Sequence, residues 1–227
     1  MSDYTASQVP QASHSNNKAI SKAVIKRLPR YYRFLGELLK SGAVRISSRE
    51  LSDRMGLTAS QIRQDLNCFG GFGQQGYGYN IQELHEEIGK ILGLDHRSDA
   101  ILIGAGNLGR AVANHMDFDQ RGFHLIGIFD QNPELIGQRI KDIPIMHTDE
   151  IEEFCKTHSP VIAILCIPKT ATKAISDRLI SLGIHGFWNF SHYDLLDRHS
   201  GIVVENVHMS DSLMTLSYEI KELQKKK

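Results

Sequence analysis

The 227-residue sequence has little cysteine and no long hydrophobic run. Its three cysteines, Cys68, Cys155 and Cys166, show no CxxC spacing, which argues against both a disulfide framework and a zinc site. No apolar segment approaches the length of a membrane span, and the start of the chain contains no apolar signal region. These absences predict a protein of the reducing cytoplasm, with no metal site and no membrane partner.

The sequence also lacks net charge, but its charges are unevenly distributed. Residues 18–67 contain eleven Lys or Arg against four Asp or Glu, so this block carries +7 and the rest of the chain −7. A basic block joined to an acidic one is typical of a nucleic-acid-binding module attached to another domain. A solvated basic face without a partner would give the same count, so charge alone does not establish nucleic-acid binding.

Residues 100–130 are organised as an apolar run, a glycine-rich turn, a helix-compatible segment and a second apolar run ending on an acid. In this pattern Gly104 allows a tight turn, Gly106 admits a pyrophosphate, and Gly109 permits close packing of helix on strand. Phosphates bind the helix N-terminus, and Asp130 accepts from the ribose hydroxyls. An ordinary tight turn in an α/β domain is the alternative. The predicted cofactor contacts are Gly104, Ala105, Gly106, Asn107, Leu108, Gly109, Asp130 and, after a later strand, Pro168.

The basic block has the pattern of a helix-turn-helix. Apolar residues recur at helical spacing from residue 19, and Pro29 is predicted to start a second helical segment that ends at Gly42. Two capping boxes, at residues 47–50 and 58–61, predict short helices over 50–55 and 59–68.

The second short helix and the stretch after it predict contacts with DNA. Ile62, Leu66 and Phe69 are spaced to face inward, which leaves polar side chains on other faces to read base edges. The stretch GGFGQQGYGYNI that follows is typical of a β-hairpin wing along a nucleic-acid backbone. On the helices alone, a solvated polar face explains the pattern equally well. The predicted DNA contacts are Arg30, Arg49, Gln61, Arg63, Gln64, Asn67, Gln75 and Tyr77.

Beyond Asp130, short apolar runs alternate with helical patterns, which predicts an open parallel sheet with helices on both faces. Residues 143–145 are predicted to form a short edge segment. The fold class is therefore α/β, with the domains divided as follows: a disordered tail 1–17, a winged helix 18–95, a Rossmann-type domain 96–209 and a C-terminal helix 210–227. The last helix has a narrow apolar stripe at Leu213, Leu216, Ile220 and Leu223, and it either docks on its own domain or crosses to a partner subunit.

Three strings resemble one known family, the redox-sensing repressors called Rex. RQDLNCFGGFGQQGYGYNI resembles their recognition helix and wing, GAGNLGRAVANHMDFDQRGF their NAD-binding loop, and VVENVHMSDSLMTLSY their C-terminal helix junction. The resemblance covers residues 20–223. It implies a homodimer of winged-helix and Rossmann domains that exchanges its C-terminal helices. It also implies a repressor of fermentative and respiratory genes on inverted repeats with TTGT- and ACAA-like ends, released from DNA by NADH, with NAD competing or favouring the bound form.

The same resemblance assigns further residues. Met209 would cover the partner's nicotinamide pocket. Arg33 matches an arginine that in some members joins a tyrosine and an aspartate in a ligand-dependent switch, but those positions hold His115 and His208 here. A packed or surface imidazole is the alternative role for each histidine. The NFAP-like motif of the family is replaced by NFSH at residues 189–192.

Two other functions compete with this interpretation. One is an NAD-dependent dehydrogenase, but no histidine lies beside an acid in a catalytic motif, and about 110 residues after the glycine loop leave no substrate domain. We therefore predict no enzyme activity. The other is a thiol-sensing repressor that uses Cys68, although a lone cysteine at the end of a helix is more often a small buried apolar residue.

Overall fold

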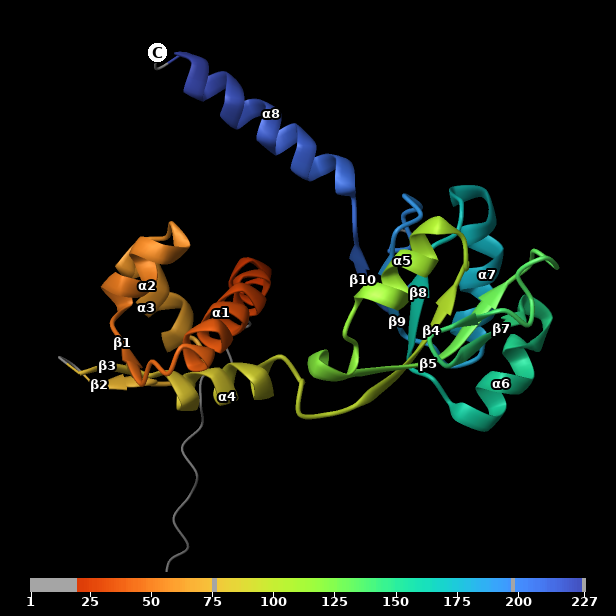
Figure 1. Ribbon diagram of the computed structural model, residues 1–227, viewed down its shortest axis with the longest axis horizontal. Helices are drawn as coiled ribbons and strands as arrows, with labels where there is room; N and C mark the ends of the chain where they lie inside the picture. The colour runs from red at the N-terminus through yellow and green to blue at the C-terminus, as the bar shows by residue number, and fades with distance from the viewer. Residues whose placement is uncertain (1–19, 75–76, 197–198, 226–227) are drawn as a thin grey trace, which may run out of the picture. The chain divides into compact units, whose positions relative to one another are not determined.

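The computed structural model describes residues 20–74, 77–196 and 199–225, and the chain divides into two compact units, Met1–Leu92 and Gly93–Lys227 (Figure 1). The predicted tail 1–17 and Gln75 lie outside the described residues. The division falls three residues before the predicted boundary, within the same connecting loop. The described part of the chain contains no helix long and apolar enough to span a bilayer.

The first unit is a winged helix-turn-helix. A three-stranded antiparallel sheet, in the order β1-β3-β2, accompanies its helices. Leucine, isoleucine and tyrosine side chains from all four helices form one core, centred on Leu28, Tyr31, Ile62 and Leu84. The elements are α1 Lys22–Lys40, β1 Arg45–Ile46, α2 Ser48–Met55, α3 Ala59–Asn67, β2 Gly73–Gln74, β3 Gly78–Asn80 and α4 Ile81–Ile91.

Helix α1 is continuous through Pro29, so the prediction of a second helical segment starting there is wrong. Proline has no N–H and cannot bond the carbonyl four residues earlier, which normally breaks a helix. Here Val24 and Leu28 before the proline, and Tyr31 and Leu35 after it, are buried on one face. Packing of that face on the core holds the helix together.

The first of the two capping boxes is present and the second is only half formed. Ser47 accepts from the Glu50 amide at 3.1 Å, and the Glu50 carboxylate accepts from the Ser47 amide at 2.8 Å. At the start of α3, Thr58 accepts from the Gln61 amide at 3.1 Å, but the Gln61 side chain bonds Asp65 instead of returning to Thr58. The prediction of a second box is wrong because a carboxylate competes for that side chain.

The hairpin formed by β2 and β3 depends on a glycine. Gly78 has a φ of +69°, and a Cβ there would lie 2.6 Å from the Ile46 carbonyl oxygen on the neighbouring β1. Only glycine allows this turn and this close approach of strands. Strand β1 was not predicted because two residues give no period.

The second unit is a Rossmann-type α/β domain built on a seven-stranded sheet, ordered β10-β9-β8-β4-β5-β7-β6. All neighbouring strands are parallel except β6 and β7. The elements are β4 Ser98–Ile103, α5 Asn107–His115, β5 Phe123–Asp130, β6 Arg139–Ile140, β7 Ile143–His147, α6 Ile151–His158, β8 Ile162–Leu165, α7 Lys169–Ser181, β9 Gly186–Asn189, β10 Val203–Asn206 and α8 Met209–Lys225.

The prediction of an edge segment at residues 143–145 is wrong, because β7 lies between β5 and the short β6. Helices cover both faces of the sheet, as expected. Residues of α5 pack with Ala100 and Leu102 on one face, whereas residues of α6 and α7 pack with Ile101 and Ile103 on the other. The chain leaves the central strand β4 toward β5 and later returns to its other side at β8. The carboxyl ends of β4 and β8 therefore form the switch point where such sheets bind ligands.

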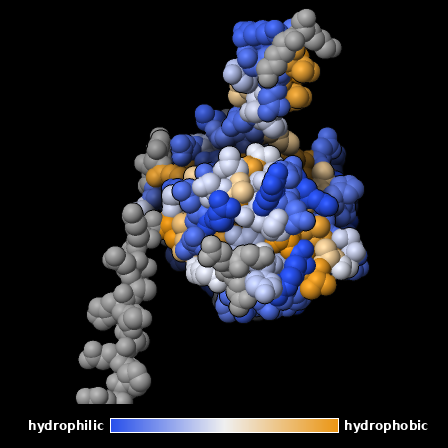
Figure 2. Space-filling model, turned by 90° about the vertical axis from the view of Figure 1, so that its left-hand side faces the viewer, coloured by the Kyte–Doolittle hydropathy of each residue, from blue (hydrophilic) through white to orange (hydrophobic). Residues whose placement is uncertain are grey.

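Helix α8 has an uncovered apolar surface. None of its residues, Met209–Lys225, is buried. The stripe residues Leu213, Leu216, Ile220 and Leu223 are 46–67% exposed. Figure 2 shows a row of hydrophobic residues of this helix in orange beside a row of hydrophilic residues in blue. Within their own unit, the described residues provide no surface that buries the stripe.

Candidate functional site

The glycine loop connects β4 to α5, and its three glycines have different surroundings. Gly104 has a φ of +97°, and a Cβ on Gly109 would come within 1.8 Å of the Gly104 carbonyl oxygen, so the fold itself requires both. Gly106 has an ordinary φ of −68°. Among the described residues, no atom beyond its chain neighbours lies within 4 Å of a Cβ placed on Gly106. The missing side chain at Gly106 therefore serves access to the N-terminus of α5, not packing.

Asp130, at the end of β5, holds the glycine loop in place. Its Oδ2 accepts from the Ala105 amide at 2.6 Å, and its Oδ1 accepts from the Asn132 amide at 2.8 Å. The sequence predicted an acid near a ribose but not its bond to the loop. The carboxylate is thus fixed before any ligand arrives.

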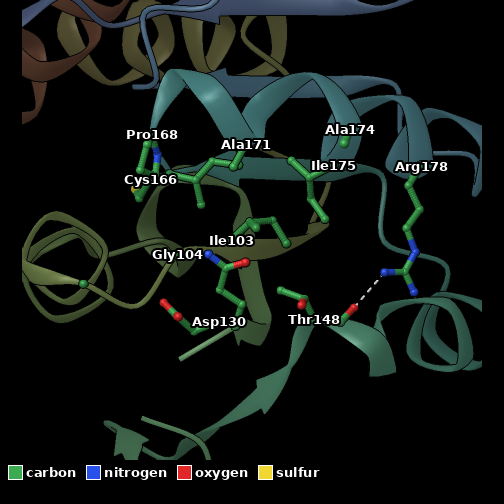
Figure 3. Close-up of a pocket in the computed structure, with 13 residues that line it drawn as sticks. Ile103, Gly104, Asp130, Thr148, Cys166, Pro168, Ala171, Ala174, Ile175 and Arg178 are labelled. Carbon is green, nitrogen blue, oxygen red and sulfur yellow. Dashed lines mark hydrogen bonds between the residues drawn. The ribbon is translucent and has the colours of Figure 1, made fainter. Parts of the chain in front are cut away.

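A cavity of about 440 Å³ opens at the carboxyl ends of β4, β5 and β8 (Figure 3). Figure 3 shows Ala171 and Ile175 of α7 on one side of the cavity and Asp130 on the opposite side, so an apolar wall faces a carboxylate. Small-molecule sites in proteins have this size and this mixture of apolar walls and few polar groups. The lining residues are Ile103, Gly104, Gly106, Asp130, Gln131, Thr148, Cys166, Ile167, Pro168, Ala171, Ala174, Ile175 and Arg178.

Arg178 and Cys166 complete two ends of the cavity. Arg178 donates from Nη1 to the Thr148 carbonyl at 3.0 Å and from Nη2 to the Asp149 carbonyl at 3.2 Å. Burial raises the pKa of the Cys166 thiol to about 12, so the sulfur stays protonated and uncharged at neutral pH. Cys166 therefore adds no charge to the cavity lining.

The structure brings four predicted cofactor residues together in this cavity, namely Gly104, Gly106, Asp130 and Pro168. Ala105 is buried in the loop, Gly109 is buried in α5, Asn107 is exposed at the start of α5, and Leu108 packs toward the core. Met209, the first residue of α8, is 60% exposed. The wall residues of α7 were missed because a helical pattern does not indicate which strand end its helix adjoins.

The residues assigned to a switch lie in three places. Arg33 is exposed on α1, and His115 is exposed as the last residue of α5. His208 contacts His192, with their Nδ1 atoms 2.8 Å apart and ring centroids 4.8 Å apart at 22°. One Nδ1 donates to the other, so the two rings hold different tautomers when neutral. His208 therefore has a partner beside the α8 junction in its own unit.

In the winged helix, Arg63, Gln64 and Asn67 are exposed on α3. Arg63 donates to the Ser48 hydroxyl at 3.1 Å. Arg49 is exposed on α2, and Tyr77 is 69% exposed in the wing. These residues keep side chains that can reach a ligand outside the unit.

Two other predicted contacts have partners inside the unit. Arg30 donates to the Met55 carbonyl at 2.5 Å, at the end of α2. Gln61 donates from Nε2 to Asp65 Oδ1 at 2.8 Å. Cys68 is exposed at the end of α3 and bonds the Gln64 carbonyl at 3.3 Å, so the expectation of a buried cysteine is wrong. Cys68 is the C-cap residue of α3, and it follows the last buried residue of the helix, Leu66.

Gln61 belongs to a group that we call the Asp65 cluster, consisting of Arg27, Tyr31, Gln61 and Asp65. Asp65 is fully buried, and Arg27 donates to both carboxylate oxygens at 2.6 and 2.7 Å. Tyr31 donates to Oδ2 at 2.9 Å. Burial alone would raise the pKa of Asp65, but the hydrogen bonds from Arg27, Gln61 and Tyr31 outweigh it and hold that pKa below its usual range.

The Asp65 cluster fixes α3 on α1, and sequence reasoning missed it. The signal was present, because Asp65 lies at i+3 from Ile62 and directly before Leu66, on the apolar stripe of α3. A charged residue on a buried stripe indicates a buried partner. The partner, Arg27, lies 38 residues earlier, and no local pattern could identify it.

Comparison with known families matches both units. Residues 19–67 match a family model described as "Putative DNA-binding protein N-terminus", and residues 95–193 match a model described as "CoA binding domain". The redox-sensing transcriptional repressor Rex of Clostridioides difficile is 54% identical over 91% of this chain and 98% of that relative. The Rex protein of Caldanaerobacter subterraneus subsp. tengcongensis is 56% identical over 92% of each chain. This chain belongs to the Rex family.

Solved structures of Rex-family proteins have the same fold. The crystal structure of RSP in complex with β-NAD⁺ and operator DNA is 55% identical, covers 92% of this chain and 97% of that chain, and superposes with a TM-score of 0.83. The structure of RSP with β-NADH is 51% identical, covers 92% of this chain and 99% of that chain, and has the same TM-score. The Rex resemblance seen in the sequence, and the α/β fold class of winged helix and Rossmann domain, are thus confirmed.

Proposed function

We propose that this protein is a transcriptional repressor that binds operator DNA through its winged helix and leaves the operator when NADH occupies the Rossmann cavity. The single observation that carries the proposal is membership of the Rex family at more than half identity over nine-tenths of the chain. A structural neighbour in that family was solved with β-NAD⁺ and operator DNA, and another structure with β-NADH. The relatives are repressors, and the proposed role involves no turnover.

The geometry of each unit supports the proposal. Residues 18–67, which carry a net charge of +7, contain helices α1, α2 and α3 of the winged helix, and Arg49, Arg63 and Tyr77 are exposed in this unit. In the second unit, the open N-terminus of α5 and the fixed Asp130 carboxylate lie where a pyrophosphate and a ribose would bind. The first unit therefore has exposed residues suited to a polyanion, and the second unit has groups suited to a dinucleotide.

A redox sensor must distinguish NADH from NAD, whose nicotinamide ring carries a positive charge that NADH lacks. We propose that Met209, exposed at the start of α8, covers that ring in the partner subunit. An apolar lid disfavours the cationic ring because it removes water without supplying a counter-charge. A repressor acts at the chromosome, so the proposed function places the protein in the cytoplasm.

The function is tested by titrating a complex of the full-length protein and an inverted-repeat duplex with NADH, and separately with NAD, in gel-shift assays. NADH should release the duplex, whereas NAD should retain it. The Cys68→Ser variant should respond as the wild type does. Release by oxidant alone, abolished in Cys68→Ser, would instead establish thiol sensing, and steady consumption of NADH with a carbonyl compound would establish an enzyme.

Substituting Arg63 by alanine should relax base preference at one position of the operator. An arginine that bonds guanine in bidentate fashion contributes roughly 1–3 kcal/mol of discrimination. Arg49→Ala, on the exposed face of α2, is the matched control and should weaken binding to all duplexes alike and reduce the salt dependence. The measurement is affinity for the operator and its single-base variants at several salt concentrations. Equal loss on specific and random DNA for Arg63→Ala would place Arg63 on the phosphates.

Substituting Asp130 by asparagine should reduce the preference for NADH over NADPH. In the wild type a 2′-phosphate would meet the Asp130 carboxylate as a like charge. Asparagine removes that charge but keeps an oxygen for the Ala105 amide, whereas Asp130→Ala leaves the amide without its acceptor and serves as the control for loop damage. Calorimetry with each cofactor gives the ratio of the NADH affinity to the NADPH affinity. A wild type that binds NADPH as tightly as NADH would contradict the proposed ribose contact.

A further inference from the structure

Gln61 occupies the first turn of α3, the turn that reads bases in helix-turn-helix proteins. A glutamine with a free amide presents an NH2 donor group and a carbonyl acceptor, and it can bond adenine at two positions. In this structure the amide is not free, because Nε2 donates to Asp65 Oδ1 at 2.8 Å. The side chain is also half-buried. Its contribution to base recognition is therefore set by Asp65.

The orientation of the Gln61 amide follows from the chemistry of its partner. An ionised carboxylate only accepts hydrogen bonds, so the reversed amide would place Oε1 against a carboxylate oxygen. The carboxylate itself cannot turn away, because the Arg27 fork binds both of its oxygens and Tyr31 binds Oδ2. The Gln61 amide nitrogen is thus held toward the protein and its oxygen is turned away from Asp65.

We propose that Asp65 is a positioning residue that determines which base Gln61 recognises. With one N–H of its amide bonded to Asp65, Gln61 turns Oε1, an acceptor, away from the carboxylate and keeps one N–H for another partner. An acceptor held in this direction pairs with the amino group of adenine N6 or cytosine N4. The buried acid of the recognition helix thereby fixes the direction in which the Gln61 amide meets a base. This inference rests on the proposed function as a DNA-binding repressor.

A purely structural role for Asp65 must be separated from this one, because the cluster also joins α3 to α1. The matched control is Tyr31→Phe, which removes a hydrogen bond to Oδ2 and leaves the bond from Gln61 to Oδ1 untouched. Asp65→Asn removes the charge and lets either end of the Gln61 amide face residue 65. A structural role predicts that both variants weaken binding alike at every base pair.

The experiment uses full-length protein, with folding checked by circular dichroism. The preferred duplex is selected from a random library by the wild type, and affinities are measured for all its single-base-pair variants. Gln61→Ala should lose discrimination of about fivefold or more at one base pair, the usual cost of a single mismatch. Asp65→Asn should lose discrimination at that same base pair, the double variant should lose no more than either single one, and Tyr31→Phe should keep the wild-type profile.

An Asp65→Asn profile equal to that of the wild type, or a loss spread evenly over the site, would overturn the inference. A change at a base pair other than the one affected by Gln61→Ala would overturn it as well. The proposed function fails differently, because then the wild type would bind selected and random duplexes with equal affinity.

Discussion

Replacing Gly106 with valine should abolish the response to NADH and leave folding and operator binding intact. The structure requires no glycine at this position, since φ is −68° and a Cβ would point into open space among the described residues. That space lies in front of the first amides of α5, which have no partners within the helix. A valine side chain would occupy the place proposed for the pyrophosphate. Losing two hydrogen bonds to a charged group costs about 3–6 kcal/mol, or roughly 10²–10⁴ in affinity.

Calorimetry with NADH and thermal unfolding measure the two parts of this prediction. Ala111→Val, which adds methyl groups at an exposed position of the same helix, should bind NADH normally. Gly109→Ala should behave in the opposite way to Gly106→Val, because its Cβ would lie 1.8 Å from the Gly104 carbonyl oxygen and must disturb the fold. Undiminished NADH binding by Gly106→Val would place the cofactor away from the glycine loop.

Disrupting the apolar stripe of α8 should convert the protein to a folded monomer with poor operator affinity. Leu216 and Ile220 are 50% and 46% exposed in the single chain, so we propose that a second subunit covers them. Met214 and Tyr218, also exposed, lie about 160° around the helix from the stripe. One flat surface cannot cover both sides, which favours a helix inserted into a partner.

The double variant Leu216→Glu with Ile220→Glu should sediment as a monomer, as should a chain lacking residues 210–227. Losing the second half-site contact should cost about 10²–10⁴ in affinity for an inverted repeat, the usual gain from bivalent binding. Ser210→Glu with Thr215→Glu adds the same charge about 100–120° around the helix from the centre of the stripe and should remain dimeric. A stable dimer after truncation would mean that the subunits meet elsewhere.

The parts of this molecule that sequence reasoning predicted correctly were those specified by local patterns. The capping box at Ser47 and Glu50, the wing and the order from Gly104 to Asp130 depend on residues close together in the chain. The continuity of α1 through Pro29 was missed because tertiary packing overrides local propensity. The bonds of Gln61 and Arg30 inside the unit were missed because polar residues on an exposed helix face have the same pattern whether bound or free. The α7 wall of the cavity depends on the strand order, which no local window contains.

The proposed switch sets an energy that the cofactor must supply. Two winged helices on a dimer bind two half-sites only when their separation matches the helical repeat of DNA, so a modest rotation between subunits ends binding. Shifting a population of dimers from nearly all able to bind DNA to nearly all unable to bind it takes about 5.5 kcal/mol of difference in ligand affinity between the two arrangements. Two NADH sites that each supply about half of this lie within the usual range of allosteric coupling, about 1–3 kcal/mol. NADH must therefore bind the DNA-incompetent arrangement more tightly.

The central claim, that NADH and operator binding are coupled through the protein, is tested most directly by reciprocity. NADH affinity is measured by calorimetry on the free dimer and on the dimer saturated with an operator duplex, and operator affinity is measured with and without saturating NADH. Linkage requires the two factors to be equal. We predict that saturating operator weakens NADH binding by the same factor by which NADH weakens operator binding. An NADH affinity that saturating operator leaves unchanged would contradict the redox switch.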